Sequence, residues 1–134
     1  MEIIVKDLQK KIKIGKKWVK KTAGIILRKL RVNGELNIVL ADNKYIKRLN
    51  RKYRHKNRAT DVLSFHGEGG MIGDIIISAE RAKTQAGKYG NSFLDEMRTL
   101  IRHGILHLRG YTHKEMKKLQ CRSIIESKFK TLIL

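Results

Sequence analysis

Three of the chain's five histidines lie close together, at His103, His107 and His113. On a helix, His103 and His107 are four residues apart and share one face, with side chains about 6 Å apart, so both can bind one metal ion. Gly110 follows them, and glycine readily adopts the left-handed conformation that ends a helix and reverses the chain. We therefore expect His113 to return over the same face. Three imidazole ligands leave a fourth position open for water or substrate, which is typical of a catalytic zinc site.

This set of ligands predicts one zinc ion per chain, with nickel as a second metal that imidazole suits. The alternative is an ordinary helix end, at which the histidines are hydrated or hydrogen-bonded. The spacing of the three histidines and the glycine where a reversal is needed favour the metal site. No motif for a small-molecule cofactor accompanies them.

One helix must carry the first two histidines. Ser92, with Asp95 three residues later, predicts its start. Its apolar stripe for packing consists of Leu94, Met97, Ile101, Ile105 and Leu108. The side that carries the histidines also carries Glu96, two turns before His103, which is a candidate acceptor for an imidazole N–H. The alternative for Glu96 is a surface carboxylate beside arginines, and the sequence leaves both readings open.

The remaining elements are predicted from apolar periodicity and turn residues. We expect strands at 2–6, 36–41, 60–65 and 72–78, and helices at 16–31, about 42–53, 79–90, about 93–109 and roughly 114–127. Ile46, Leu49 and Tyr53 should form the inner face of the second helix. The glycine-rich connection 67–70 is short, so the strands on either side of it should be antiparallel. Gly73, inside the last strand, predicts a bulge or a close approach of backbone.

The composition is that of one soluble domain spanning residues 1–134. No apolar run approaches the roughly 18 residues of a membrane span, so no membrane partner is expected. The single cysteine, Cys121, excludes an internal disulfide. The first residues lack the basic-then-apolar order of a secretory signal, and we therefore expect a cytoplasmic location.

The net charge of +19 is unevenly distributed. Residues 1–60 carry 19 lysines and arginines and four acidic residues, whereas residues 61–134 carry twelve and eight. Such a basic surface favours a nucleic acid partner over a merely hydrated surface. From Lys44 to Arg58 there are eight basic residues and no acidic one. Arg54, Lys56 and Arg58 lead into a strand, where site residues are often found.

Residues 103–113, His-Gly-Ile-Leu-His-Leu-Arg-Gly-Tyr-Thr-His, resemble two families. Their histidine spacing is that of the metzincin zinc peptidases, in which a glutamate general base directly follows the first histidine; here that position is Gly104. The closer similarity is to the YbeY family of bacterial endoribonucleases, whose hallmark is His-Gly-x-Leu-His-Leu-x-Gly-Tyr-Asp-His. Only Thr112 departs from it. Segments 49–54, 60–65 and 73–75 also match that family, in the same order.

The resemblance implies an α+β fold: a mixed four-stranded sheet with helices packed on it, and a zincin-like helix carrying the metal-binding histidines. It implies a zinc-dependent, single-strand-specific endoribonuclease that acts in ribosomal RNA maturation and ribosome quality control, with ribosomal RNA and the small ribosomal subunit as partners. Arg54 corresponds to the arginine that the family uses near the metal, and we expect it to be catalytic. Thr112 replaces the family's aspartate and keeps its capping ability but not its charge. Ala59 and His66 replace prolines.

The basic stretch is expected to contact the RNA backbone without reading sequence, through Arg51, Lys52, Lys56 and Arg58. Glu96 and Thr112 are expected to contact the histidine ligands without binding the metal themselves. Two other functions remain open. One is a non-catalytic RNA- or ribosome-binding protein in which zinc only stabilises the last two helices, and the other is a metzincin-like metallopeptidase.

Overall fold

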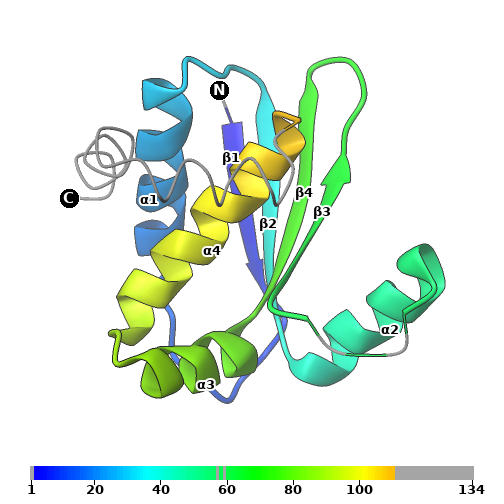
Figure 1. Ribbon diagram of the computed structural model, residues 1–134. Helices are drawn as coiled ribbons and strands as arrows, with labels where there is room; N and C mark the ends of the chain where they lie inside the picture. Colours follow the sequence, from blue (N-terminus) through cyan, green and yellow to red (C-terminus); the bar gives the residue numbers. More distant parts are fainter. Residues whose placement is uncertain (1, 57, 59, 111–134) are drawn as a thin grey trace.

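The computed structural model describes residues 2–56, 58 and 60–110 (Figure 1). The strands are β1 (Glu2–Asp7), β2 (Glu35–Ala41), β3 (Val62–His66) and β4 (Met71–Ser78). The helices are α1 (Lys16–Lys29), α2 (Asn43–Arg54), α3 (Ala79–Tyr89) and α4 (Phe93–Leu108). The strands form one sheet in the order β1-β2-β4-β3, in which only the pairing of β3 with β4 is antiparallel. The expected α+β fold with a mixed four-stranded sheet is confirmed.

The two faces of the sheet are covered by different helices (Figure 1). Side chains alternate between faces along a strand, so Ile75 and Ile77 enter the larger core with α1 and α4. Ile76 points to the other face, where it packs with Leu63 and with Ile46 of α2. Helix α2 therefore lies on the opposite side of the sheet from α4, next to β3 and β4.

Helix α4 approaches the sheet closely because it carries a glycine at the contact. A Cβ on Gly104 would lie 2.8 Å from Cγ2 of Ile75, closer than real contacts allow. Ser64 of β3 donates from Oγ to the main-chain oxygen of Gly104 at 3.3 Å. These contacts fix the level of α4 over β3 and β4.

Gly73 confirms the predicted bulge and close backbone approach. The register between β2 and β4 shifts between Glu35 and Leu36, opposite the segment that contains Gly73. Gly73 has a φ of +149°, and a Cβ there would overlap the main-chain oxygen of Phe65. Glycine is therefore required both for its backbone conformation and for the close approach.

Side-chain caps mark the starts of α2, α3 and α4, and the predicted cap at Ser92 is confirmed. The side chains of three caps each accept a main-chain N–H: Asp42 from Tyr45 at 2.8 Å, Ser78 from Arg81 at 3.1 Å and Ser92 from Asp95 at 3.1 Å. No helix in residues 2–56 or 60–110 is long and apolar enough to cross a membrane. The helix expected at 114–127 lies outside the described residues.

Some details of the prediction were wrong. The third strand begins at Val62 rather than at residue 60, and in the bend before it the Asp61 carboxylate accepts the Val62 N–H at 2.8 Å. Tyr53 is 56% exposed instead of facing the core, and its ring meets the edge of Phe65 at 5.6 Å between centroids. Leu94 is 42% exposed, whereas its neighbour Phe93 packs against the core in the first turn of α4.

Candidate active site

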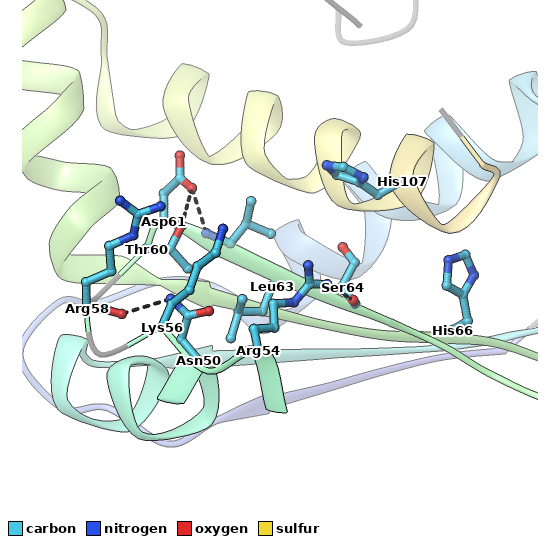
Figure 2. A pocket seen from close by; sticks show the side chains of 11 residues that line it. Asn50, Arg54, Lys56, Arg58, Thr60, Asp61, Leu63, Ser64, His66 and His107 are labelled. Atoms are coloured by element: carbon cyan, nitrogen blue, oxygen red, sulfur yellow. Dashed lines mark hydrogen bonds between the residues drawn. The ribbon is translucent and has the colours of Figure 1, made fainter. Parts of the chain in front are cut away.

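A pocket of about 340 Å³ opens between α2, β3 and the C-terminal half of α4 (Figure 2). Its lining comes from segments far apart in the sequence: Asn50, Arg54, Lys56, Arg58, Thr60, Asp61, Val62, Leu63, Ser64, His66 and His107. Basic side chains enter from α2 and the loop after it, and imidazoles enter from β3 and α4. The pocket thus combines cations that suit phosphate with side chains that suit a metal or a proton.

The two described histidines of the predicted metal site lie on successive turns of α4. His103 and His107 are both half-buried, and His107 lines the pocket. The helix ends as predicted, with Gly110 at a φ of +89° and its N–H donating to the oxygen of His107 at 3.0 Å. His113, the third predicted ligand, lies outside the described residues. Two half-buried imidazoles one turn apart beside an open polar pocket fit a zinc ion.

Within residues 2–56, 58 and 60–110, no group of three or more His, Cys, Asp or Glu side chains is arranged to hold a metal ion. A three-histidine site in this chain would need His113 in addition to the two described histidines. The complete ligand set therefore stays a prediction.

Arg54 is anchored to the strand that forms the floor of the pocket. Its Nη2 donates to the main-chain oxygen of Ser64 at 2.8 Å, and its guanidinium carbon lies 5.7 Å from the centre of the Phe65 ring. Ser64 in turn contacts Gly104 of α4, so α2, β3 and α4 are linked through these residues. The bond to Ser64 uses one of the five N–H donors of the guanidinium, which keeps donors for an anion.

The loop after α2 is folded back onto that helix by Asn50. This side chain is 3% exposed and donates from Nδ2 to the main-chain oxygen of Arg58 at 2.9 Å (Figure 2). His55 ends α2 in the left-handed conformation, with a φ of +56°. The N–H of Lys56 then donates to the oxygen of Asn50 at 3.3 Å. Asn50 therefore positions the backbone that carries Lys56 and Arg58.

The four predicted RNA-binding residues divide into two groups. Lys56 and Arg58 line the pocket, whereas Arg51 and Lys52 do not line it. All four side chains are exposed, and those of Arg51 and Lys52 belong to the last turn of α2. The pocket therefore has a basic rim, and further basic residues follow along α2.

Glu96 is buried, so the reading of it as a surface carboxylate is wrong. It is 9% exposed, and this burial raises its pKa, with a smaller contribution from the negative charge of Asp61. Asp61 lines the pocket, and its carboxylate accepts from Val62 N at 2.8 Å and from Thr60 Oγ1 at 3.3 Å. The role of Glu96 as an acceptor for an imidazole N–H stays a prediction. Thr112, predicted beside it, lies outside the described residues.

Several pocket residues had not been singled out from the sequence as site residues, and His66 is the most informative. Side chains alternate along β3, so His66 points to the same face as Ser64, toward α4. His66 pairs with Gly73, and a Cβ on Gly73 would lie 2.8 Å from Leu108, so His66 is level with the end of α4. Figure 2 shows its imidazole at the end of the pocket near His107. Only the strand alternation in the sequence hints at this.

The surroundings of Gly104 bear on the peptidase alternative. In metzincins this position carries the general base, but here it faces Ile75 and has no room even for a methyl group. A carboxylate could not occupy it without moving α4 away from the sheet. The peptidase reading therefore lacks both the residue and the space for it.

Comparison with known proteins finds a family match over nearly the whole chain. The sequence profile of the family described as "Endoribonuclease YbeY" matches residues 4–130. A relative of that name from Geobacter metallireducens is 37% identical in an alignment 131 positions long, and the match covers 91% of this chain and 87% of the relative. One from Aquifex aeolicus is 43% identical over 112 residues, covering 79% and 75%.

A third relative of that name, from Syntrophomonas wolfei, is 44% identical over 100 residues. The match there spans 64% of this chain and 64% of the relative, so less than two thirds of that protein's length is covered. Among solved structures, TM1509 from Thermotoga maritima is similar, with a TM-score of 0.65 and 27% identity. That similarity covers 98% of this chain and 86% of TM1509.

Proposed function

The chain belongs to the YbeY endoribonuclease family, and from that premise we propose that it is a metal-dependent endoribonuclease acting on single-stranded RNA. Its proposed substrate is ribosomal RNA, during maturation and ribosome quality control at the small subunit in the cytoplasm. The observation that carries the proposal is the shared pocket: Arg54 of α2 and His107 of α4 line the same cavity with Lys56 and Arg58.

The proposed metal ligands are His103, His107 and His113, and the proposed ion is zinc, with nickel as the alternative. When bound, the ion would supply Lewis-acid polarisation of the phosphodiester. His103 and His107 support this assignment because both are half-buried on one side of α4, and His107 borders the space in which RNA would lie.

Arg54 is the proposed catalytic cation. Cleavage of a phosphodiester adds negative charge to the phosphorus centre in the transition state, and a guanidinium that is already positioned stabilises this charge without reorganising. The contacts of Arg54 with Ser64 and Phe65 supply that positioning. Lys56 and Arg58 would bind the phosphates that flank the cleaved bond. Arg51 and Lys52 would bind phosphates farther along the RNA.

The test compares Arg54→Ala with His107→Ala on an RNA that has a folded part and a single-stranded tail. Arg54→Ala should keep its metal and lose cleavage about 10²- to 10³-fold, because only charge stabilisation is removed. His107→Ala should lose both metal and cleavage. Arg28→Ala, exposed on α1, is the matched control and should change neither. Undiminished cleavage by His107→Ala would contradict the proposal.

The same preparations separate the two other functions. If zinc were only structural, chelation would lower the melting temperature and leave RNA cleavage unchanged. A peptidase would digest casein in a chelator-sensitive reaction. The close contact of Gly104 with Ile75 argues against the peptidase.

A further inference from the structure

A second basic surface lies away from the pocket, on the loop before α1 and the first turns of that helix. We call it the lysine surface; it consists of Lys10, Lys11, Lys13, Lys16, Lys17, Lys20 and Lys21. All seven side chains are exposed, and residues 10–21 contain no acidic residue. The proposed cleavage reaction does not use any of them.

The lysine surface destabilises the helix on which it lies. Lys16 and Lys20, and likewise Lys17 and Lys21, are like charges four residues apart, which repel each other across one helical turn. They also lie at the N-terminal end of α1, where the helix dipole disfavours cations. Helix α1 has no acidic residue in its first turn and no side-chain cap.

The other helices on the same face of the sheet show the usual arrangement. Helices α3 and α4 begin with serine caps and carry acidic residues in their first turns. Local electrostatic rules are thus broken at α1 and obeyed at α3 and α4, while α2 has an aspartate cap but no acidic residue in its first turn. Such violations concentrate at functional sites, where a partner offsets them.

The protein itself neutralises little of this charge. Among the seven lysines, all of which are described, only Lys11 forms an ion pair, with Glu80 at 3.3 Å. The lysine side chain is 69% exposed, so the pair contributes little. The lysine surface therefore keeps nearly its full positive charge for a partner.

One edge of the lysine surface, at Lys11, lies close to the start of α2. The carboxylate of Glu80 that pairs with Lys11 also accepts the N–H of Asn43, the first residue of α2, at 3.1 Å. Figure 1 shows the loop between β1 and α1 and the start of α2 at the same end of the sheet. From there, exposed basic residues follow α2 to the pocket: Lys44, Lys47, Arg48, Arg51 and Lys52. At 1.5 Å per residue this helix is about 18 Å long.

We propose that the lysine surface is a second RNA-binding surface, which holds the phosphate backbone of a substrate whose cleaved segment lies in the pocket. This inference rests on the proposed function, because it takes RNA as the substrate. An RNA must extend along α2 to reach both places, so affinity should depend on RNA length.

The chemistry of the surface favours a phosphate polymer over an acidic protein. Within residues 10–21, the exposed residues are the seven lysines and Gly15. Protein interfaces have an apolar core with aromatic side chains, whereas Ile12, Ile14 and Trp18 in this segment are only partly exposed. Lysines that bind phosphates hold RNA without reading its sequence.

The test uses a triple variant, Lys16→Gln, Lys17→Gln and Lys20→Gln. The matched control carries Lys29→Gln, Lys83→Gln and Lys88→Gln, which are exposed on α1 and α3. Both lower the net charge from +19 by three, so a difference between them cannot come from net charge. Glutamine has nearly the helix propensity of lysine, and the test variant loses like-charge repulsion, so it should melt at the same temperature or higher.

The measurement is binding of a long ribosomal RNA fragment as a function of salt, with cleavage of an oligonucleotide of about six nucleotides in parallel. The test variant should bind the long RNA about tenfold more weakly, and its log–log salt slope should fall by about 2, the amount expected for three phosphate contacts on a single strand. Cleavage of the short oligonucleotide should stay within about twofold, because that RNA is held in the pocket. The control should match the wild type in both assays.

If both triple variants bound the long RNA equally weakly, or if the test variant bound it as tightly as the wild type, the inference would be overturned. The proposed function would remain intact. A wild-type protein that binds neither RNA would overturn both. Polyglutamate that competes as well as RNA, through the same three lysines, would overturn the assignment of RNA as the partner.

Discussion

The guanidinium of Arg54 makes directional contacts that a lysine cannot reproduce. One N–H is used at the oxygen of Ser64, the group lies over the Phe65 ring, and the remaining donors border the pocket. Lysine keeps the charge, but its three N–H donors diverge from one nitrogen, so it lacks the planar fork that can bind Ser64 and still present paired donors to a phosphate.

We expect Arg54→Lys to lower kcat for RNA cleavage about 10²-fold, with the metal content unchanged, because the positioned charge is lost while the net charge is kept. Single-turnover cleavage with metal analysis measures this. Arg48→Lys, on an exposed position of the same helix, should stay within about twofold of the wild type. Full activity of Arg54→Lys would show that only net charge matters there.

Asn50 acts through the backbone of the loop after α2. Asn50→Ala removes the donor for the Arg58 oxygen, so we expect the free energy of unfolding to fall by about 1 to 2 kcal/mol. The loosened loop should raise KM for RNA more than it lowers kcat, because Lys56 and Arg58 bind substrate. Chemical denaturation and steady-state kinetics measure the two effects. An Asn50→Ala variant with the KM of the wild type would refute the positioning role. Asn33→Ala, in an exposed turn, is the control for an asparagine removed far from the pocket.

The buried carboxyl of Glu96 predicts a pH dependence of stability. Burial first, and then the charge of Asp61, raise its pKa above the ordinary value of 4.5. Between that value and the raised pKa the folded state binds more protons than the unfolded state. The contribution of Glu96 to stability is therefore greatest at low pH, and it falls as the pH rises through this window.

Glu96→Gln cannot ionise, so it should melt at a higher temperature than the wild type at neutral pH. The difference should shrink as the pH falls toward about 4. Thermal unfolding across this range tests the prediction. Glu68→Gln, in the exposed turn between β3 and β4, should change stability by less than about 0.5 kcal/mol throughout. A variant less stable than the wild type at neutral pH would mean that the ionised carboxylate makes a favourable contact.

At the scale of elements, the close packing of α4 on the sheet depends on the absence of a side chain at Gly104. We expect Gly104→Ala to destabilise the protein by about 1 to 3 kcal/mol, because the new methyl group overlaps Ile75 in a packed core. Gly87→Ala in α3 is the matched control: a Cβ there meets nothing within 4 Å. Alanine should stabilise that helix by about 0.5 to 1 kcal/mol. In equilibrium unfolding, the two substitutions should change the free energy of unfolding in opposite directions. Changes in the same direction would contradict the explanation by packing.

Elements were predicted best where one local interaction defines them. The cap at Ser92 was predicted because a single side chain and the N–H three residues later make the contact. The interior faces of helices were predicted less well. Tyr53 and Leu94 follow the apolar period but are exposed, although Tyr53 meets Phe65 at its edge and Phe93, beside Leu94, packs against the core. Periodicity gives the side of a helix that faces inward, not the length over which another element covers it.

At the scale of the whole molecule, the pocket is assembled by long-range packing that no local pattern contains. The histidine motif and its resemblance to a known family predicted His107 and Arg54, both of which line the pocket. His66, Asp61 and Asn50 join them only because β3 pairs with β4 and α4 crosses above. The composition predicted an excess of charge in the first half of the chain. The structure adds that the loop before α1 and the start of α2 lie at the same end of the sheet, and that exposed basic residues of α2 lead from there to the pocket.

The central claim is that a metal ion and RNA meet in this pocket. The most direct test is to measure zinc per chain and RNA cleavage in the same wild-type preparation, before chelation, after chelation and after zinc is restored. We expect one zinc ion per chain, loss of cleavage on its removal and recovery when it is returned. Undiminished cleavage of single-stranded RNA by the metal-free protein would contradict the claim.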